Sequence, residues 1–256
     1  MNSIYSLLAP FYDAINGSVD YEKWADFYVS EFRRYEKTKT SLVLDLGCGT
    51  GSMTLALARR GYDMTGVDNC PEMLDAAQKR SMREGFYGKI LYLCQDMTAF
   101  ELYGTVDAVV CCLDGMNHLT TTADFRKTLS LVHNYLAPDG LFLFDLNSEY
   151  KFRTVYGDRA YLYECGATVC AWQNAYHEKS GLCDFSITLF TRERNGLYRR
   201  SEEWQREKMY KDATVRRLLR ESGFELLSVA QDINGTEPTD TSLRLYYTAR
   251  AIKPQM

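Results

Sequence analysis

The chain has 256 residues, of which 46% are hydrophobic, and its formal net charge is −4 at neutral pH. This length and composition fit one globular domain with an insertion, or two small domains, and they exclude an intrinsically disordered chain. Acidic and basic residues are interspersed, which argues against nucleic acid as a partner because proteins that bind it usually carry a basic face.

No apolar segment is long enough to span a membrane, and residues 1–9 lack the cationic start and the apolar run of a signal peptide. The eight cysteines are scattered along the chain without a repeated Cys-x-x-Cys pattern. We therefore expect a cytoplasmic protein with reduced and mostly buried thiols.

The chain begins with an aromatic-rich stretch that contains Tyr5 and Tyr12. An amphipathic helix capped by Asp20 is expected over residues 21–35. Its apolar stripe, which begins at Trp24, is suited to packing on a sheet. Tyr5, Tyr12 and Trp24 could instead surround a bound cation, because aromatic faces attract positive charge.

Residues 43–51 read Val-Leu-Asp-Leu-Gly-Cys-Gly-Thr-Gly, and a helical pattern over residues 52–60 follows them. The pattern predicts a buried strand, a glycine turn and the N-terminus of a helix. Alternating glycines remove side chains where a ligand must lie against the backbone. The N–H groups at the start of the helix would favour a carboxylate or a phosphate of that ligand.

Two ligand classes use such a turn. Dinucleotide-binding folds favour G-x-G-x-x-G, but Ser52 occupies the third glycine position of that pattern here. The acidic-x-Gly-x-Gly-x-Gly form instead resembles motif I of the class I S-adenosylmethionine (SAM)-dependent methyltransferases. The resemblance implies an α/β, doubly wound, Rossmann-like fold with a seven-stranded sheet, and SAM as the cofactor. It assigns these residues of the turn to cofactor binding: Asp45, Gly47, Cys48, Gly49 and Gly51.

The second expected strand, residues 64–67, ends in an acid where this family places its ribose contact. The resemblance implies that Asp68 accepts the ribose hydroxyls, with Asn69 and Met73 beside it. Dinucleotide folds share this feature, so Asp68 alone does not separate the two classes. It could also be only an N-terminal charge on the helix expected over residues 71–83.

The third expected strand, residues 90–93, leads to Asp96 and Met97. By the same resemblance, Asp96 accepts the adenine amino group and Met97 lies against the adenine ring. A solvated loop acid is the alternative for Asp96. In many members of the family the segment before motif I folds over the cofactor, which favours Tyr12 and Trp24 as further contacts.

An apolar run over residues 106–112 predicts the fourth strand, buried on both faces. Leu113 follows as an expected cofactor contact, and Asp114, Asn117 and His118 are expected polar groups at the mouth of the site. The signatures of DNA-base methylating enzymes are absent from this stretch. The catalytic candidates are therefore Asp114, His118 and Tyr12, although His118 could equally be a helix-entry histidine.

The pattern changes after residue 150, beyond a helix expected over 122–135 and a strand over 141–146. Residues 182–191 alternate apolar and polar side chains, as a half-buried antiparallel strand does, and Asn195-Gly196 predicts a hairpin turn. Residues 160–173 and 197–210 would be the neighbours of that strand, giving an insert of three or four strands.

The insert also carries His177 and three cysteines, Cys165, Cys170 and Cys183, but their spacing is poor for a tetrahedral site and no metal is expected. The doubly wound pattern resumes with a helix over residues 213–222. Two last strands, 225–230 and 242–252, would form an antiparallel edge hairpin, which ordinary dinucleotide domains lack.

These observations divide the chain into residues 1–40 over the cofactor site, residues 41–150 with 211–256 as the SAM-binding domain, and residues 151–210 as an acceptor lid. The layout resembles methyltransferases that act on sugar amines and on glycine-like amines, which implies a small-molecule acceptor, an amine, and S-adenosylhomocysteine as the product. The insert could also form a homodimer contact. The alternatives are an RNA methyltransferase, a SAM-binding regulator without catalysis, and a nicotinamide-dependent oxidoreductase.

Overall fold

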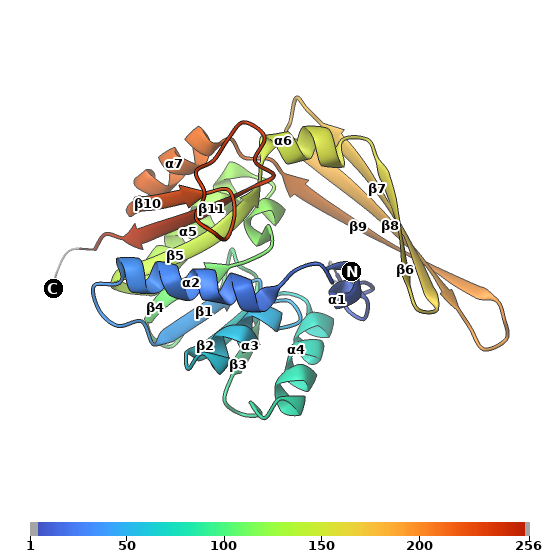
Figure 1. Ribbon diagram of the computed structural model, residues 1–256, viewed down its shortest axis with the longest axis horizontal. Helices are drawn as coiled ribbons and strands as arrows, with labels where there is room; N and C mark the ends of the chain where they lie inside the picture. The colour runs from blue at the N-terminus through green and yellow to red at the C-terminus, as the bar shows by residue number, and fades with distance from the viewer. Residues whose placement is uncertain (1–4, 254–256) are drawn as a thin grey trace.

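The computed structural model describes residues 5–253. Residues 1–4 of the predicted segment 1–40 and residues 254–256 of the predicted segment 211–256 lie outside that range. Residues 1–4 also belong to the stretch that lacks the features of a signal peptide. A seven-stranded sheet carries helices on both faces, and a separate four-stranded antiparallel sheet projects beside it (Figure 1). The strands of the larger sheet are β1 (Leu42–Leu46), β2 (Asp63–Asp68), β3 (Leu91–Cys94), β4 (Val106–Cys111), β5 (Leu136–Asn147), β10 (Phe224–Ala230) and β11 (Arg244–Ala251).

The strand order of the large sheet is β10-β11-β5-β4-β1-β2-β3. The pairs from β5 to β3 are parallel, whereas β11 is antiparallel to both β5 and β10. The predicted fold class and its antiparallel edge hairpin are therefore confirmed. The chain winds outward from β1 to β3 and then returns to the other side of β1 at β4. Ligands of open α/β sheets bind at such a reversal, outside the carboxyl ends of the strands.

Alternate side chains of the central strands feed two cores, one on each face of the sheet. Val43 of β1 belongs to the core that α2 and α3 cover, and Leu44 and Leu46 belong to the core that α5 and α7 cover. This alternation follows from the two-residue period of a strand. The helices that flank the sheet are α2 (Tyr21–Tyr35), α3 (Ser52–Arg59), α4 (Pro71–Arg83), α5 (Thr122–Tyr135) and α7 (Asp212–Glu221).

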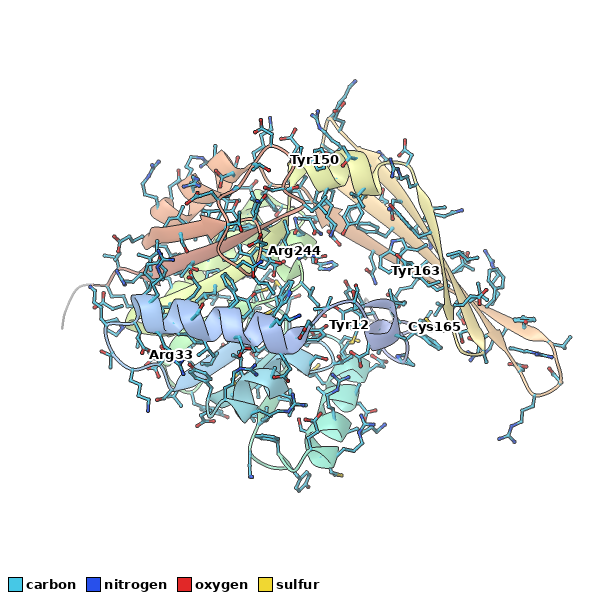
Figure 2. The ribbon with its side chains drawn as sticks, viewed as in Figure 1. Tyr12, Arg33, Tyr150, Tyr163, Cys165 and Arg244 are labelled. Atoms are coloured by element: carbon cyan, nitrogen blue, oxygen red, sulfur yellow. The ribbon has the colours of Figure 1, made fainter. Side chains whose placement is uncertain are left out.

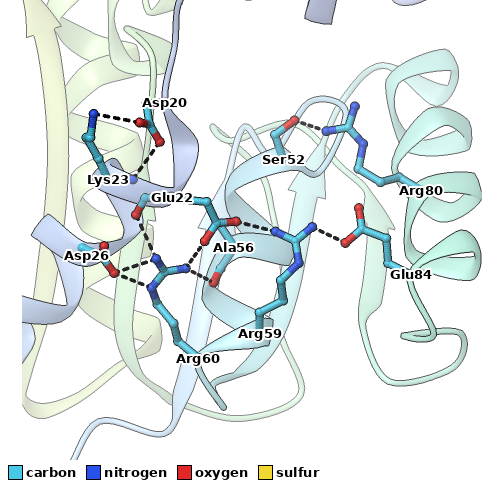
Figure 3. A network of polar contacts seen from close by, with 10 residues as sticks. All are labelled: Asp20, Glu22, Lys23, Asp26, Ser52, Ala56, Arg59, Arg60, Arg80 and Glu84. Carbon is cyan, nitrogen blue, oxygen red and sulfur yellow. Dashed lines mark hydrogen bonds and ion pairs between the residues drawn. The ribbon is translucent and has the colours of Figure 1, made fainter.

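Ion pairs hold the first turns of α2 against the end of α3 (Figure 3). Arg60 pairs with Glu22 and Asp26 of α2, each at 2.6 Å. Arg59 pairs with Glu22 and with Glu84, which follows α4. Each pair is partly exposed and adds little stability alone. Together they fix α2 against α3 on one face of the sheet.

The insert forms the four-stranded sheet, in the order β6-β7-β8-β9. The predicted segment 160–173 is in fact a hairpin, because Gly166 turns the chain with a positive φ of 61°. The structure also has short helical turns that the sequence pattern did not predict, in the N-terminal segment, after β4, and between the two sheets. The bounds are β6 (Ala160–Cys165), β7 (Thr168–His177), β8 (Leu182–Arg192) and β9 (Tyr198–Lys208), with α1 (Tyr12–Ile15), η1 (Gly115–His118), α6 (Glu149–Lys151) and η2 (Phe152–Tyr156) as the turns.

The apolar face of the insert packs on other parts of the same chain. Ile187 and Leu189 contact a cluster with Leu8, and Cys183 and Phe185 contact a cluster with Phe152. This face therefore covers the N-terminal segment and η2. None of the helices described between residues 5 and 253 is long and apolar enough to cross a membrane.

Candidate active site

The glycines of the turn after β1 have different spatial roles. Gly47, Gly49 and Gly51 all have positive φ, between 52° and 75°, a conformation that other residues rarely adopt. A Cβ on Gly51 would lie 2.8 Å from the Tyr92 hydroxyl and 2.9 Å from Ala77 Cβ, so this position needs glycine for the packing of α4 and β3. A Cβ on Gly49 would meet no atom within 4 Å. The backbone of Gly49 is therefore bare and borders open space.

Asp68, at the end of β2, organises the same turn. One carboxylate oxygen accepts the Gly49 N–H at 2.8 Å, and the other accepts the Cys70 N–H at 2.8 Å. Burial raises the pKa of Asp68, and these backbone donors oppose that rise. The contact with Cys70 is the helix-start interaction considered above as an alternative. Asp68 makes this helix-start contact and also lines a cavity at the end of β2, so the ribose role and the helix-start role are compatible.

A cavity opens where the carboxyl ends of β1, β2 and β4 meet, as the switch in strand order predicts. Most of the predicted cofactor residues lie around it. The predicted residues that line it are Tyr12, Gly47, Gly49, Asp68, Asn69, Met73, Met97, Leu113 and His118. Tyr5 and Gln95 also line this cavity, called here the cofactor cavity.

Two other predicted residues, Asp45 and Cys48, do not line the cofactor cavity itself. Asp45 is buried and accepts the Thr54 hydroxyl at 2.6 Å, and burial raises its pKa to about 7. Cys48 is buried beside Gly66. Both line a small cavity that adjoins the cofactor cavity, because the two share Gly47, Gly49 and Leu113 in their linings.

Asp96 and Trp24 also lie outside the lining of the cofactor cavity. Asp96 is exposed, and its carboxylate accepts the backbone N–H and the hydroxyl of Thr98. Trp24 is buried, with its ring centroid 5.3 Å from that of Tyr246. Its place in the core fits the sheet-packing alternative, and the cofactor roles of Asp96 and Trp24 stay predictions.

The turn after β4 is strained and carries an ion-paired acid. Leu113 and Asp114 both have positive φ, 52° and 55°, which is uncommon for residues other than glycine. Arg244 of β11 lies 2.8 Å from the Asp114 carboxylate and also pairs with the buried Asp145. Burial alone would raise the pKa of Asp114, but Arg244 and Lys151 lower it to about 2. Asp114 is therefore ionised at neutral pH.

His118 is held against the N-terminal segment. Its Nε2 lies 2.8 Å from the Tyr5 hydroxyl, and burial lowers the pKa of its imidazole despite the nearby Asp114. Glu203 of the insert accepts the backbone N–H groups of Tyr5 and Leu7, at 2.8 and 3.0 Å. The imidazole is thus neutral at neutral pH, and the insert fixes the tyrosine that contacts it.

A second cavity, of about 400 Å³, lies between α1, η2 and the insert and shares Tyr5, Tyr12 and Leu113 with the first. It is called here the acceptor cavity. In Figure 2, Arg244 comes from the large sheet, Tyr163 from the insert, and Tyr12 lies between them. Three charged residues of its lining were not predicted from the sequence: Lys151, Glu207 and Arg244. Only for Glu207 did the sequence offer a signal. In Glu203-x-Gln205-x-Glu207 a polar residue recurs at every second position of a strand, and the structure buries all three.

Known proteins match both the sequence and this geometry. Residues 43–140 match the family model described as a methyltransferase domain. The chain is 32% identical to a putative methyltransferase, YqeM, of Bacillus subtilis over 255 residues, which cover 98% of each chain. It is 26% identical to a glycine/sarcosine N-methyltransferase of Halorhodospira halochloris, over 88% of this chain and 81% of that one.

The crystal structure of a SAM-dependent methyltransferase from Clostridium acetobutylicum superposes with a TM-score of 0.86 at 28% identity, covering 97% of this chain and 99% of that one. The fold and the glycine turn at the strand switch are those of an enzyme that binds SAM. The chain belongs to the SAM-dependent methyltransferase family, which confirms the resemblance read from motif I.

Proposed function

We propose that the enzyme methylates an amino group of a small molecule bound in the acceptor cavity. The observation that carries this proposal is the junction of the two cavities at Tyr5, Tyr12 and Leu113. A cofactor in one cavity and an acceptor in the other would meet there. The printed activity of the Halorhodospira relative, glycine/sarcosine N-methylation, supports an amine as the acceptor.

The residues around the cofactor cavity suit SAM. The bare backbone at Gly49 leaves room for the methionyl end, Asp68 would accept the ribose hydroxyls, and Met97 would lie against the adenine. When bound, SAM supplies a methyl group that its sulfonium already activates. Tyr5 and Tyr12 stand at the junction, where their aromatic faces would favour that positive charge.

The protein then has to position the amine in line, exclude water and remove one proton. A neutral amine forms the new C–N bond with its lone pair as the S–CH₃ bond breaks, and the electrons of the broken bond remain on sulfur. We assign the surplus proton to His118, through the Tyr5 hydroxyl, because the imidazole is neutral and already contacts Tyr5. Asp114 is committed to Arg244, so it holds charge at the junction instead of accepting the proton.

The insert serves in this proposal as the lid over the acceptor, since Tyr163 and Trp172 line the acceptor cavity. Its outer face, with Trp204 65% exposed, is where a homodimer contact would form. Light scattering at micromolar concentration tests the dimer. A monomer mass would contradict it without affecting the proposed reaction.

The direct test is a methylation screen with SAM over amines, carboxylic acids, sugar nucleotides and RNA, measured as release of S-adenosylhomocysteine. We expect turnover with amines and none with RNA. The variant His118→Ala should keep its SAM affinity and lose turnover. Turnover with RNA alone, or SAM binding with no turnover in any class, would contradict the proposal.

A further inference from the structure

The acceptor cavity is large for a simple amine. Its volume of about 400 Å³ lies within the range of about 300–1,000 Å³ that holds drug-sized ligands. One water takes about 30 Å³ of liquid volume, so glycine would occupy only a small part of this space. The cavity therefore suits an acceptor larger than that of the glycine/sarcosine relative.

The lining of the acceptor cavity includes two basic residues, Lys151 and Arg244, which differ in their ion pairs. Arg244 pairs with Asp114 and Asp145. The ammonium of Lys151 donates to the Asn147 side chain at 2.8 Å and lies 5.0 Å from the Tyr156 ring centre, and it forms no ion pair with a carboxylate in the described part of the chain.

Glu207 is the nearby carboxyl that could neutralise this ammonium. It is buried and accepts the other end of the Asn147 amide at 3.2 Å. Burial, and then Asp114, raise the pKa of Glu207 well above its usual range, so its carboxyl favours the neutral form. Burial, and then Arg244, lower the pKa of Lys151, and Asp114 and Glu207 oppose that fall. Lys151 lines the cavity without an ion pair to a carboxylate among the described residues, so it can bind an anion of the ligand, whose negative charge would favour the ammonium form.

Another part of the lining of the acceptor cavity is an aromatic wall on the insert, made of Tyr161, Tyr163 and Trp172. The two tyrosine rings are nearly parallel, with centroids 6.5 Å apart, and Trp172 stands edge-on to Tyr163 at 6.5 Å. All three side chains are only half-buried, although they point to the inner face of the sheet. Leu8 lines the same cavity, and Tyr163 and Trp172 pack against the cluster that contains it. A flat apolar group would bury these faces and pair with the rings.

Resting on the proposed N-methylation, we infer that the acceptor is an amino-acid-like amine that carries a flat, apolar side group. Its carboxylate binds Lys151, its side group lies on the aromatic wall, and its amino group reaches the junction at Tyr5, Tyr12 and Leu113. Both recognition elements lie in one cavity with that junction, which is why a single small molecule can satisfy them together.

Four commercial amines separate the two recognition elements. Phenylalanine has the carboxylate and the ring, glycine only the carboxylate, phenethylamine only the ring, and ethylamine neither. Affinity is measured by calorimetry on the full-length protein loaded with S-adenosylhomocysteine, and turnover is measured with SAM. We expect phenylalanine to bind at least about tenfold more tightly than glycine and phenethylamine, a difference of about 1.4 kcal/mol. Equal binding of phenylalanine and glycine, or of phenylalanine and phenethylamine, would overturn the inference, as would no binding of phenylalanine.

Variants test each contact with a matched control. Trp172→Ala should weaken phenylalanine and phenethylamine about tenfold, while Trp204→Ala, on the exposed outer face of the same sheet, should not. Lys151→Gln should weaken the binding of phenylalanine about tenfold and leave the binding of phenethylamine unchanged. The control is Lys208→Gln, because the Lys208 ammonium donates to the Ser180 carbonyl, and it should change the binding of neither amine. Equal losses for phenylalanine and phenethylamine in Lys151→Gln would contradict the carboxylate contact.

The inference and the proposed function fail in different ways. Tight binding of phenylalanine without release of S-adenosylhomocysteine would contradict N-methylation but support this assignment of the cavity. Methylation of ethylamine and glycine as efficiently as phenylalanine would support N-methylation and overturn the inference. SAM affinity, measured for every variant, should stay unchanged because Lys151 and Trp172 lie outside the cofactor cavity.

Discussion

Replacing Arg244 with methionine should destabilise the fold more than any exposed ion pair could explain. The guanidinium serves two carboxylates, the half-buried Asp114 and the buried Asp145, and lies 5.6 Å from the Trp24 ring centre. Methionine keeps the apolar stem and removes the charge. Leaving buried charges without their partner typically costs about 3–5 kcal/mol. The fall in the pKa of Asp114 from 3.8 to about 2 alone corresponds to about 2 kcal/mol.

The pH dependence gives the prediction its sign. Because the folded pKa of Asp114 is depressed, its contribution is present above the unfolded value near 4 and is lost as the pH falls through about 2. Without Arg244, burial raises the pKa of both carboxyls, so the native variant binds protons at higher pH than the unfolded chain. The destabilisation of Arg244→Met should therefore be largest at neutral pH and shrink toward pH about 4.5.

Urea unfolding followed by circular dichroism at these two pH values measures the effect. Arg250→Met is the matched control on the same strand, because its one carboxylate partner among the described residues, Glu225, is 53% exposed. Its guanidinium also donates to the Tyr35 carbonyl at 2.7 Å, so the control should cost about 1–2 kcal/mol, less than Arg244→Met. A loss below about 1 kcal/mol for Arg244→Met at neutral pH, or a loss that grows on acidification, would refute the account of the buried triad.

Three further substitutions separate support of the site from its chemistry. Gly51→Ala should lower the free energy of unfolding by about 1–3 kcal/mol through its clash with Tyr92. Gly49→Val meets no atom but places a β-branched residue at a positive φ, so it should cost about 1–2 kcal/mol of backbone strain and, in calorimetry on the folded protein, lose SAM affinity. Asp68→Ala should weaken SAM binding by about 1.5–3 kcal/mol, and an unchanged affinity would leave the residue as a helix-start charge only. His118→Gln should lower turnover about 10²–10⁴-fold. It should also abolish the fall in activity at low pH that protonation of the His118 imidazole, whose pKa is depressed, causes in the unmodified enzyme. Full activity of this variant would leave positioning as the whole mechanism.

The cofactor half of the site could be predicted because its residues follow strand ends directly. The glycine turn after β1, Asp68 after β2 and Met97 after β3 each sit next to an apolar run, and parallel strands bring those ends to one edge of the sheet. Helical periodicity placed Trp24 on an apolar stripe, but a stripe does not reveal whether it faces the sheet or a ligand. The structure places this side chain in the core.

The acceptor half depends on contacts that no local pattern encodes. Arg244 reaches Asp114 and Asp145 because β11 pairs antiparallel with β5 in a register that sets Arg244 opposite Asn147. The sequence suggested that hairpin, but a one-residue change of register would turn the guanidinium to the other face. Lys151 lies in a short helical segment that the pattern did not predict, so its place in the cavity could not be anticipated.

The link between insert and cofactor site changes what removal of the insert can reveal. The separate units expected at residues 1–40, 41–150 with 211–256, and 151–210 stay a prediction, under which a chain trimmed of the insert would still bind SAM. Glu203, however, holds the backbone of Tyr5 and Leu7 from the insert, and Tyr5 lines both cavities. Trimming would release that wall, so a loss of SAM affinity would be consistent with a lid and equally with a misplaced Tyr5. Trp172→Ala leaves Glu203 in place and changes only the acceptor wall, and its effect on the acceptor KM at constant SAM affinity is therefore the sharper measure of whether the insert selects the substrate.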